Sequence, residues 1–394
     1  MRKLISTVLL AATSVIAFAQ GSETSTAIIR LREGDVAQAK MYIDKAYEVT
    51  MAKRAKGETI SEKIDSKFWY YRGEIYFQIH ISKKPELSEL SANPLDIATE
   101  SFIELFKIDV NQRYSKEGKE KFMFCVNGYV NKAFDAIERK EWIEAMNFFE
   151  TAYSLKQTPE FGNVIDTLTL YNAGLMAQFG EDYDNAIRIN RELINMNYGG
   201  ATTYVVLAQL YKSKGDIEGS FNAVQEGRVI YPSDKDLLIE EVNYHIKNND
   251  KEKALSTLEL AIAADPNNAL LHNAYGTILL QLGDEDKAET ALLQAVALND
   301  SIAEAYYSLG AIQVERANVL VEKMNAKGIK EADYNKLKAQ QKKHFEDSLP
   351  YFERALFLNP EDIYTLDALK VVYYKLDMDE KSMEMKKRLD ALKG

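Results

Sequence analysis

Histidine, cysteine, aspartate and glutamate are the side chains of this chain that could bind metals or move protons, but their spacing forms no site. The four histidines are far apart in the sequence: His80, His245, His272 and His344. Sixty aspartates and glutamates make adjacent carboxylates common by chance alone. No phosphate-binding loop, dinucleotide-binding glycine motif, zinc-protease motif or nucleophile elbow is present. We therefore expect a non-enzymatic protein with no catalytic residue, cofactor or metal; an enzyme or metal-binding protein is the remote alternative.

The single cysteine, Cys125, excludes an intramolecular disulfide and any zinc site made of several cysteines. It lies in an apolar run at residues 122–126, which is typical of a packed core side chain; a reactive thiol is the alternative. A large helical core folds without disulfides, so one cysteine is compatible with an oxidising compartment.

The composition predicts a helical, acidic protein. Seven prolines and nineteen glycines in 394 residues are few, because average usage is about 5% and 7%. Turn-rich β folds and low-complexity disorder are therefore disfavoured. The formal net charge of −11 argues against nucleic acid as a partner.

Residues 1–19 have the parts of a secretory signal peptide. Two basic residues precede an apolar stretch at residues 4–18, and Ala17 and Ala19 have the small-x-small spacing of a cleavage site. The apolar stretch is shorter than the roughly 18 residues that a spanning helix needs. We expect cleavage after Ala19 and a periplasmic or secreted mature chain without a transmembrane segment; an uncleaved membrane anchor is the alternative.

A period of 34 residues organises the chain from residue 167 onward. When units start at 167, 201, 235, 269 and 303, position 20 holds a small residue in the first four: Ala186, Ser220, Ala254 and Ala288. Position 8 holds Gly174, Ala208, Val242, Gly276 and Gly310. Small residues at these two positions let two helices cross closely, while larger residues three or four positions away fill the space beside the crossing.

Turn signals separate the two helices of each unit. The pairs Gly215-Asp216, Asn249-Asp250 and Gly283-Asp284 are expected to stop the first helix and cap the second. Pro232 and Pro266 are expected to end the second helix. Since no unit buries both of its faces, the units must stack.

This repeat resembles the tetratricopeptide repeat family, in which a large residue, a Leu followed by a small residue, and a tyrosine follow one another at fixed spacing. Tyr204, Leu207, Ala208 and Tyr211 match that spacing. The resemblance implies an all-α fold, a right-handed superhelical α-solenoid of about nine helix pairs. The expected units lie near 22–50, 66–108, 126–159, 167–200, 201–234, 235–268, 269–302, 303–362 and, as a C-terminal cap, 363–394. We expect solvated linkers at 50–65, 80–95 and 109–121; binding loops are the alternative.

One insertion interrupts the regular half. In the unit 303–362, twenty-six extra residues, 316–341, contain six basic and three acidic residues. Gly328 divides the insertion into two helical halves, so we expect a helical hairpin that projects beyond the neighbouring repeats. Its halves could simply pack on each other as a solvated pair, or the hairpin could be a basic docking arm.

The resemblance also implies a concave surface lined by repeat positions 2, 5, 6, 9, 12 and 13 of the first helices. These positions interleave aromatic residues with amides, which donate to and accept from a peptide backbone. We expect peptide binding by Asn131, Phe134, Tyr171, Asn172, Leu175, Phe179, Gln209, Asn243, Asn273 and Tyr307, with the region from Asn131 to Asn172 favoured. The alternative is that these side chains pack against neighbouring helices.

The basic clamp with which some family members hold a C-terminal carboxylate is absent, because its positions in the unit at 201 hold Thr202 and Val206. The sequence therefore predicts an exported scaffold that binds a protein or peptide of unknown identity. The alternative is a structural subunit of a cell-envelope secretion or outer-membrane assembly that uses the edges of the solenoid and residues 316–343. The oligomeric state is not predicted.

Overall fold

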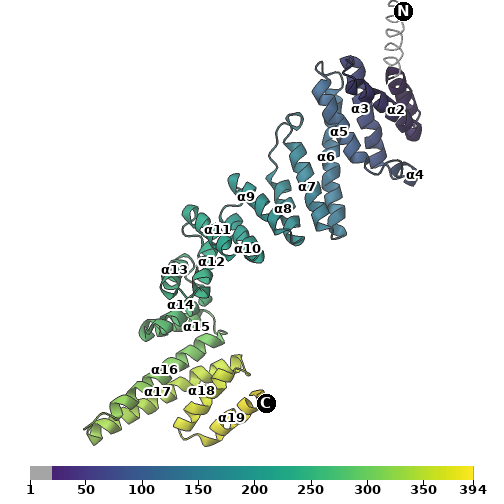
Figure 1. The fold of residues 1–394 in the computed structure, drawn as a ribbon. Coiled ribbons are helices and arrows are strands. Elements are labelled where there is room, and N and C mark those ends of the chain that lie inside the picture. Colours follow the sequence, from purple (N-terminus) through teal and green to yellow (C-terminus); the bar gives the residue numbers. More distant parts are fainter. Residues whose placement is uncertain (1–19, 394) are drawn as a thin grey trace, which may run out of the picture. The chain divides into compact units, whose positions relative to one another are not determined.

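The computed structural model describes residues 20–393, and every regular element in that range is a helix. The predicted signal peptide, residues 1–19, lies outside the described residues. The chain divides into two compact units, which we call the N-terminal unit, up to Tyr198, and the C-terminal unit, from Gly199 onward. The predicted all-α fold of successive helix pairs is confirmed (Figure 1).

The described helices of the N-terminal unit form four pairs, with one short helix and one 3-10 turn in the connections. In chain order they are residues 20–32, α2 (Val36–Ala55), α3 (Glu62–Ile81), α4 (Pro85–Ser88), α5 (Pro94–Ile108), α6 (Ser115–Glu138), α7 (Trp142–Lys156), η1 (Pro159–Phe161), α8 (Thr167–Phe179) and α9 (Tyr183–Asn195).

The described helices of the C-terminal unit form five further pairs. In chain order they are α10 (Ala201–Ser213), α11 (Ile217–Ile230), α12 (Lys235–Lys247), α13 (Lys251–Ala264), α14 (Ala269–Leu282), α15 (Glu285–Leu298), α16 (Ala303–Met324), α17 (Glu331–Leu358), α18 (Ile363–Lys375) and α19 (Asp379–Lys393).

The turns inside the pairs follow the predicted chemistry. Gly215, Asn249 and Gly283 have φ of +87°, +55° and +84°, the left-handed conformation that ends a helix. The aspartate after each one then caps the next helix; the Asp216 carboxylate, for example, accepts from the Gly219 backbone N–H at 2.7 Å. Such a cap stabilises a helix by about 1 kcal/mol.

The close helix crossing differs in one detail from the predicted contact between two small residues. A Cβ on Gly276 would lie 2.7 Å from Cγ of Leu292 and 3.1 Å from the backbone oxygen of Ala288. A Cβ on Gly310 would lie 2.8 Å from the ring of Phe352. The large residue at position 24 therefore lies across the glycine, and the small residue at position 20 lets the backbones come close enough for this.

The linkers expected at 50–65 and 80–95 are partly helical, since α2 ends at Ala55, α3 begins at Glu62 and α4 lies at Pro85–Ser88. The linker expected at 109–121 is helical in its second half, because α6 already begins at Ser115. The reason is a buried turn around the Asp109 carboxylate. It accepts hydrogen bonds from the backbone N–H groups of Arg113, Tyr114 and Ser115 and from the Ser115 hydroxyl. Burial by itself raises the pKa of Asp109, but these hydrogen bonds outweigh it and lower the pKa below its usual range.

The predicted insertion forms the outer part of the hairpin made by α16 and α17, which Figure 1 shows side by side. The two helices have 22 and 28 residues, against 13 to 15 in the other helices of the C-terminal unit. Gly328, with φ +85°, lies in the turn. The two halves pack on each other: Gln341 donates to the backbone oxygen of Ala317 at 3.2 Å.

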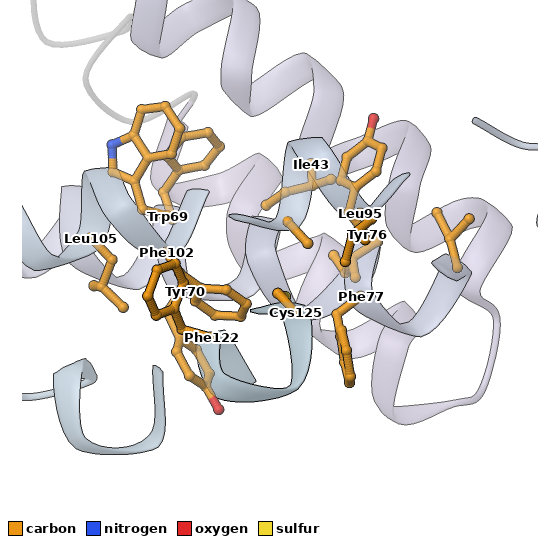
Figure 2. Close-up of a cluster of buried hydrophobic side chains, with 14 of the residues drawn as sticks. Ile43, Trp69, Tyr70, Tyr76, Phe77, Leu95, Phe102, Leu105, Phe122 and Cys125 are labelled. Atoms are coloured by element: carbon orange, nitrogen blue, oxygen red, sulfur yellow. The ribbon is translucent and has the colours of Figure 1, made fainter. Parts of the chain in front are cut away.

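The core of the N-terminal unit is formed by buried side chains of α2, α3, α5 and α6 (Figure 2). Trp69, Phe102 and Phe122 are almost completely buried. Gly73 of α3 packs against the ring of Phe102, so the crossing of the regular repeats is repeated here. The connections are longer, but the packing rule is the same.

We expect Gly276→Leu to destabilise the C-terminal unit, because the leucine cannot fit between the Leu292 side chain and the fixed Ala288 backbone. Overpacking of this kind costs about 1–3 kcal/mol. Urea unfolding followed by circular dichroism should give an earlier midpoint. Ala263→Leu on the exposed side of α13 is the matched control and should leave the midpoint unchanged. Equal midpoints for both variants would contradict the role assigned to the crossing.

Candidate functional site

A groove of about 470 Å³, which we call the C-terminal groove, opens on the C-terminal unit. Its walls come from the first helices of four successive pairs, α12, α14, α16 and α18, and from the end of α17. It is lined by Ile246, Asn273, Ala274, Thr277, Ile278, Gln281, Ala303, Glu304, Tyr307, Ser308, Ala355, Asn359, Asp362, Tyr364 and Thr365.

Regular helix geometry explains why these side chains share one surface. Residues Asn273 and Thr277 are one turn apart on α14, and Thr277 donates its hydroxyl hydrogen to the Asn273 backbone oxygen at 2.9 Å. On α16, Tyr307 is anchored by an edge contact with the ring of Phe352, with centroids 5.6 Å apart. Tyr364 projects from the first turn of α18 and is 67% exposed. The groove therefore combines a fixed aromatic ring with a solvent-accessible one.

The groove is electrostatically negative. Glu304 and Asp362 are its charged lining residues, and no lysine, arginine or histidine lines it in the part of the chain that the structure describes. Burial raises the pKa of the Tyr307 hydroxyl, and the negative charges of Asp362 and Asp367 raise it further. The field of these carboxylates therefore reaches the groove wall.

One buried polar atom of the lining residues has no partner among the described residues. The side-chain oxygen Oδ1 of Asn273 is buried and accepts no hydrogen bond there. A buried acceptor without a donor costs about 1–3 kcal/mol.

Six of the ten predicted peptide-binding residues lie on α6 and α8 of the N-terminal unit. Phe134 and Phe179 are 52% and 60% exposed, and Asn131 is exposed. Both phenylalanines nevertheless contact another ring: Phe134 contacts Phe149, and Phe179 contacts Trp142. The other three, Tyr171, Asn172 and Leu175, are half-buried on α8.

The other four predicted residues lie in the C-terminal unit, and the structure brings two of them together. Asn273 and Tyr307 line the C-terminal groove. Asn243 lies instead in a crevice with Phe221 of α11, whose ring stacks on Tyr244 at 3.8 Å. Gln209 is exposed on α10.

Sequence reasoning missed Glu304, Asp362 and Tyr364. Glu304 and Tyr364 occupy position 2 of the units that start at 303 and 363, so the same frame contains the signal for both. Tyr364 belongs to the expected C-terminal cap, which predicts a solvent-facing residue at this position. Asp362 caps α18 by accepting from the Thr365 backbone N–H at 2.8 Å. From the sequence, an aspartate at this position predicts a helix cap and not a groove residue.

Two residues that could bind a metal or react as a thiol, His245 and Cys125, are buried among other side chains. His245 is buried beside the rings of Phe221 and Tyr244. Cys125 is fully buried, and burial raises its pKa to about 12, so the thiol is not ionised near neutral pH. Within residues 20–393, no group of three or more His, Cys, Asp and Glu side chains is arranged to hold a metal ion.

None of the helices in the described range is both long enough and apolar enough to cross a membrane.

The sequence model of the tetratricopeptide repeat family matches residues 239–301. In the structure this stretch runs from α12 to the end of α15, which is two successive helix pairs with the 34-residue period. Residues 239–301 therefore form tetratricopeptide repeats (TPRs). The family resemblance inferred from residue spacing is therefore confirmed, and the matched stretch supplies α12 and α14 of the groove wall.

Known TPR proteins are similar to parts of this chain. The TPR repeat-containing protein YpiA of Bacillus subtilis (strain 168) is 25% identical over 168 residues, which is 40% of this chain. The chain spans only 39% of the length of YpiA. Among solved structures, YrrB, a TPR protein with an unusual peptide-binding site, has a TM-score of 0.40 and 19% identity, and the match covers 52% of this chain and 91% of YrrB.

A second solved structure is the C-terminal part of a TPR repeat-containing protein from Cytophaga hutchinsonii. Its TM-score is 0.46 at 14% identity, and the match covers 67% of this chain and 95% of that one. Stacked TPR units form extended concave surfaces that bind other proteins.

Proposed function

We propose that this protein is an exported, non-enzymatic scaffold that holds an extended peptide segment of a partner protein in the C-terminal groove. The observation that carries the proposal is the groove itself, because four successive first helices contribute side chains to one cavity of about 470 Å³. Ligand pockets in proteins commonly measure about 300–1,000 Å³.

The lining suits a peptide better than a featureless apolar ligand. An extended backbone exposes an N–H or C=O group at every residue, and the amides of Asn273, Gln281 and Asn359 can pair with both kinds of group. The rings of Tyr307 and Tyr364 offer large contact areas at little cost in side-chain entropy.

The combined variant Asn273→Ala with Tyr364→Ala should weaken partner capture by more than about tenfold, because truncating a central contact residue costs about 1–2 kcal/mol or more. Capture is measured by in-cell crosslinking followed by quantitative mass spectrometry. Tyr374→Ala is the matched control: this tyrosine is 65% exposed on the same helix and does not line the groove. Circular dichroism should show unchanged helicity in all variants.

A second double variant tests the predicted site in the N-terminal unit against the C-terminal groove. If Asn131→Ala with Asn172→Ala abolishes capture while the groove variant behaves like the parent protein, the binding surface is the face of α6 and α8. In that case the C-terminal groove is not the site.

Export is proposed from residues 1–19, whose basic start, apolar stretch and Ala17–Ala19 spacing match a cleavable signal peptide. Expression of the full chain in a Gram-negative host should yield a periplasmic or secreted protein. Mass spectrometry of its N-terminal peptide should show Gln20 as the first residue, and Ala19→Arg should block processing. A cytosolic protein that retains residues 1–19 would refute the proposal.

A subunit of a cell-envelope assembly is the second candidate, favoured by the α16–α17 hairpin. Its outer part carries exposed lysines that have no acidic partner among the described residues: Lys323, Lys327, Lys330, Lys336, Lys338 and Lys342. Arg316 at its base is instead fixed to α15, with Glu289 at 2.8 Å and Asp286 at 3.0 Å.

Replacing residues 319–340 with a short glycine-rich turn would remove the lysines while keeping Arg316 and the buried Ala317. If the hairpin holds an assembly together, native mass spectrometry of the crosslinked complex should show its mass fall to that of the free chain. An unchanged complex mass, together with loss of capture by the groove variant, would leave the peptide-binding scaffold as the function.

A further inference from the structure

The C-terminal groove offers hydrogen-bond acceptors in excess of donors. The Asp362 carboxylate uses only Oδ2 for the Thr365 backbone N–H and hydroxyl, so its other oxygen, Oδ1, has no partner among the described residues. Glu304 is exposed and forms no ion pair with any described residue. Glu304 of α16 and Asp362, the N-cap of α18, thus bring two carboxylates into the groove lining.

The aromatic lining, like the carboxylates, favours a cationic ligand. The rings of Tyr307 and Tyr364 line the groove, and the face of a tyrosine ring attracts a cation within about 6 Å. The raised pKa of Tyr307 reflects, after burial, the negative charges of Asp362 and Asp367. The groove therefore has the components that surround a bound organic cation: carboxylates and aromatic rings.

We infer that the C-terminal groove selects a partner segment that carries an arginine or lysine side chain, with the cation held by Glu304 and Asp362 and its aliphatic stem against Tyr307 and Tyr364. The inference rests on the proposed peptide binding and adds the class of peptide. It is the reverse of the basic clamp that captures a carboxylate, whose positions hold Thr202 and Val206 in this chain.

The charge of the chain supports the same class of partner. A formal net charge of −11 attracts cationic segments and repels acidic ones before contact. In the groove itself, the two carboxylates then discriminate between partner side chains, because they attract a basic side chain and repel an acidic one. Binding should therefore weaken as ionic strength rises.

The test uses the full chain and an array of decapeptides in which the central residue is fixed and the flanking positions are randomised. The fixed residue is arginine, lysine, glutamine, alanine or glutamate. We expect the arginine and lysine pools to bind at least about tenfold better than the glutamine pool, and the glutamate pool to bind worst.

Matched variants assign the preference to the groove. The double variant Glu304→Gln with Asp362→Asn should reduce binding of the basic pools to the level of the glutamine pool, since asparagine still caps α18. Glu346→Gln with Asp216→Asn removes the same two charges at an exposed helix position and a helix cap outside the groove, and should bind like the parent chain.

The outcomes separate the inference from the proposed function. Equal binding of all pools, or a preference for glutamate, would overturn the selection of a basic side chain while peptide binding stands. A preference for basic residues that persists in Glu304→Gln with Asp362→Asn would overturn the assignment to this groove. No binding of any pool would overturn peptide binding and the inference together.

Discussion

The close crossing of two helices over a glycine is the constraint on which the rest of this protein depends. Because glycine has no side chain, the first helix leaves a space at Gly276 and at Gly310. A large residue of the second helix fills that space: Leu292 in one pair and Phe352 in the other. A helix pair held this tightly still leaves apolar faces uncovered, so the next pair must cover them. The first helices of successive pairs consequently share one surface, and the C-terminal groove is formed on that surface.

Some residues that stabilise the fold also form the wall of the groove. Phe352 closes the crossing at Gly310 and also supports the ring of Tyr307, so one side chain fixes both the fold and a wall of the site. Asp362 likewise caps α18 with one carboxylate oxygen and leaves the other without a partner among the described residues. Because these residues serve both the fold and the groove, the groove needs no additional helix or loop to hold its lining in place.

The period of 34 residues was enough to predict the helix pairs, their turns and the long hairpin, because each depends on local signals such as Gly215-Asp216 and Gly328. The start of α6 could not be predicted, since Ser115 is held by the buried carboxylate of Asp109 and not by its own propensity. The site was predicted only in part. Asn243 and Thr277 occupy the same repeat position, yet only Thr277 lines the groove, because the neighbouring helices differ.

Photo-crosslinking from inside the groove tests peptide binding most directly. Benzoylphenylalanine in place of Tyr307 preserves an aromatic ring at the groove wall, and the same probe in place of Glu346 on the exposed side of α17 reports background contact. Crosslinks from position 307 that map to one short segment of a partner, containing an arginine or lysine and absent from position 346, are the predicted result. Equal crosslinking from both positions, or none from position 307 while the partner is still captured, would contradict binding in the C-terminal groove.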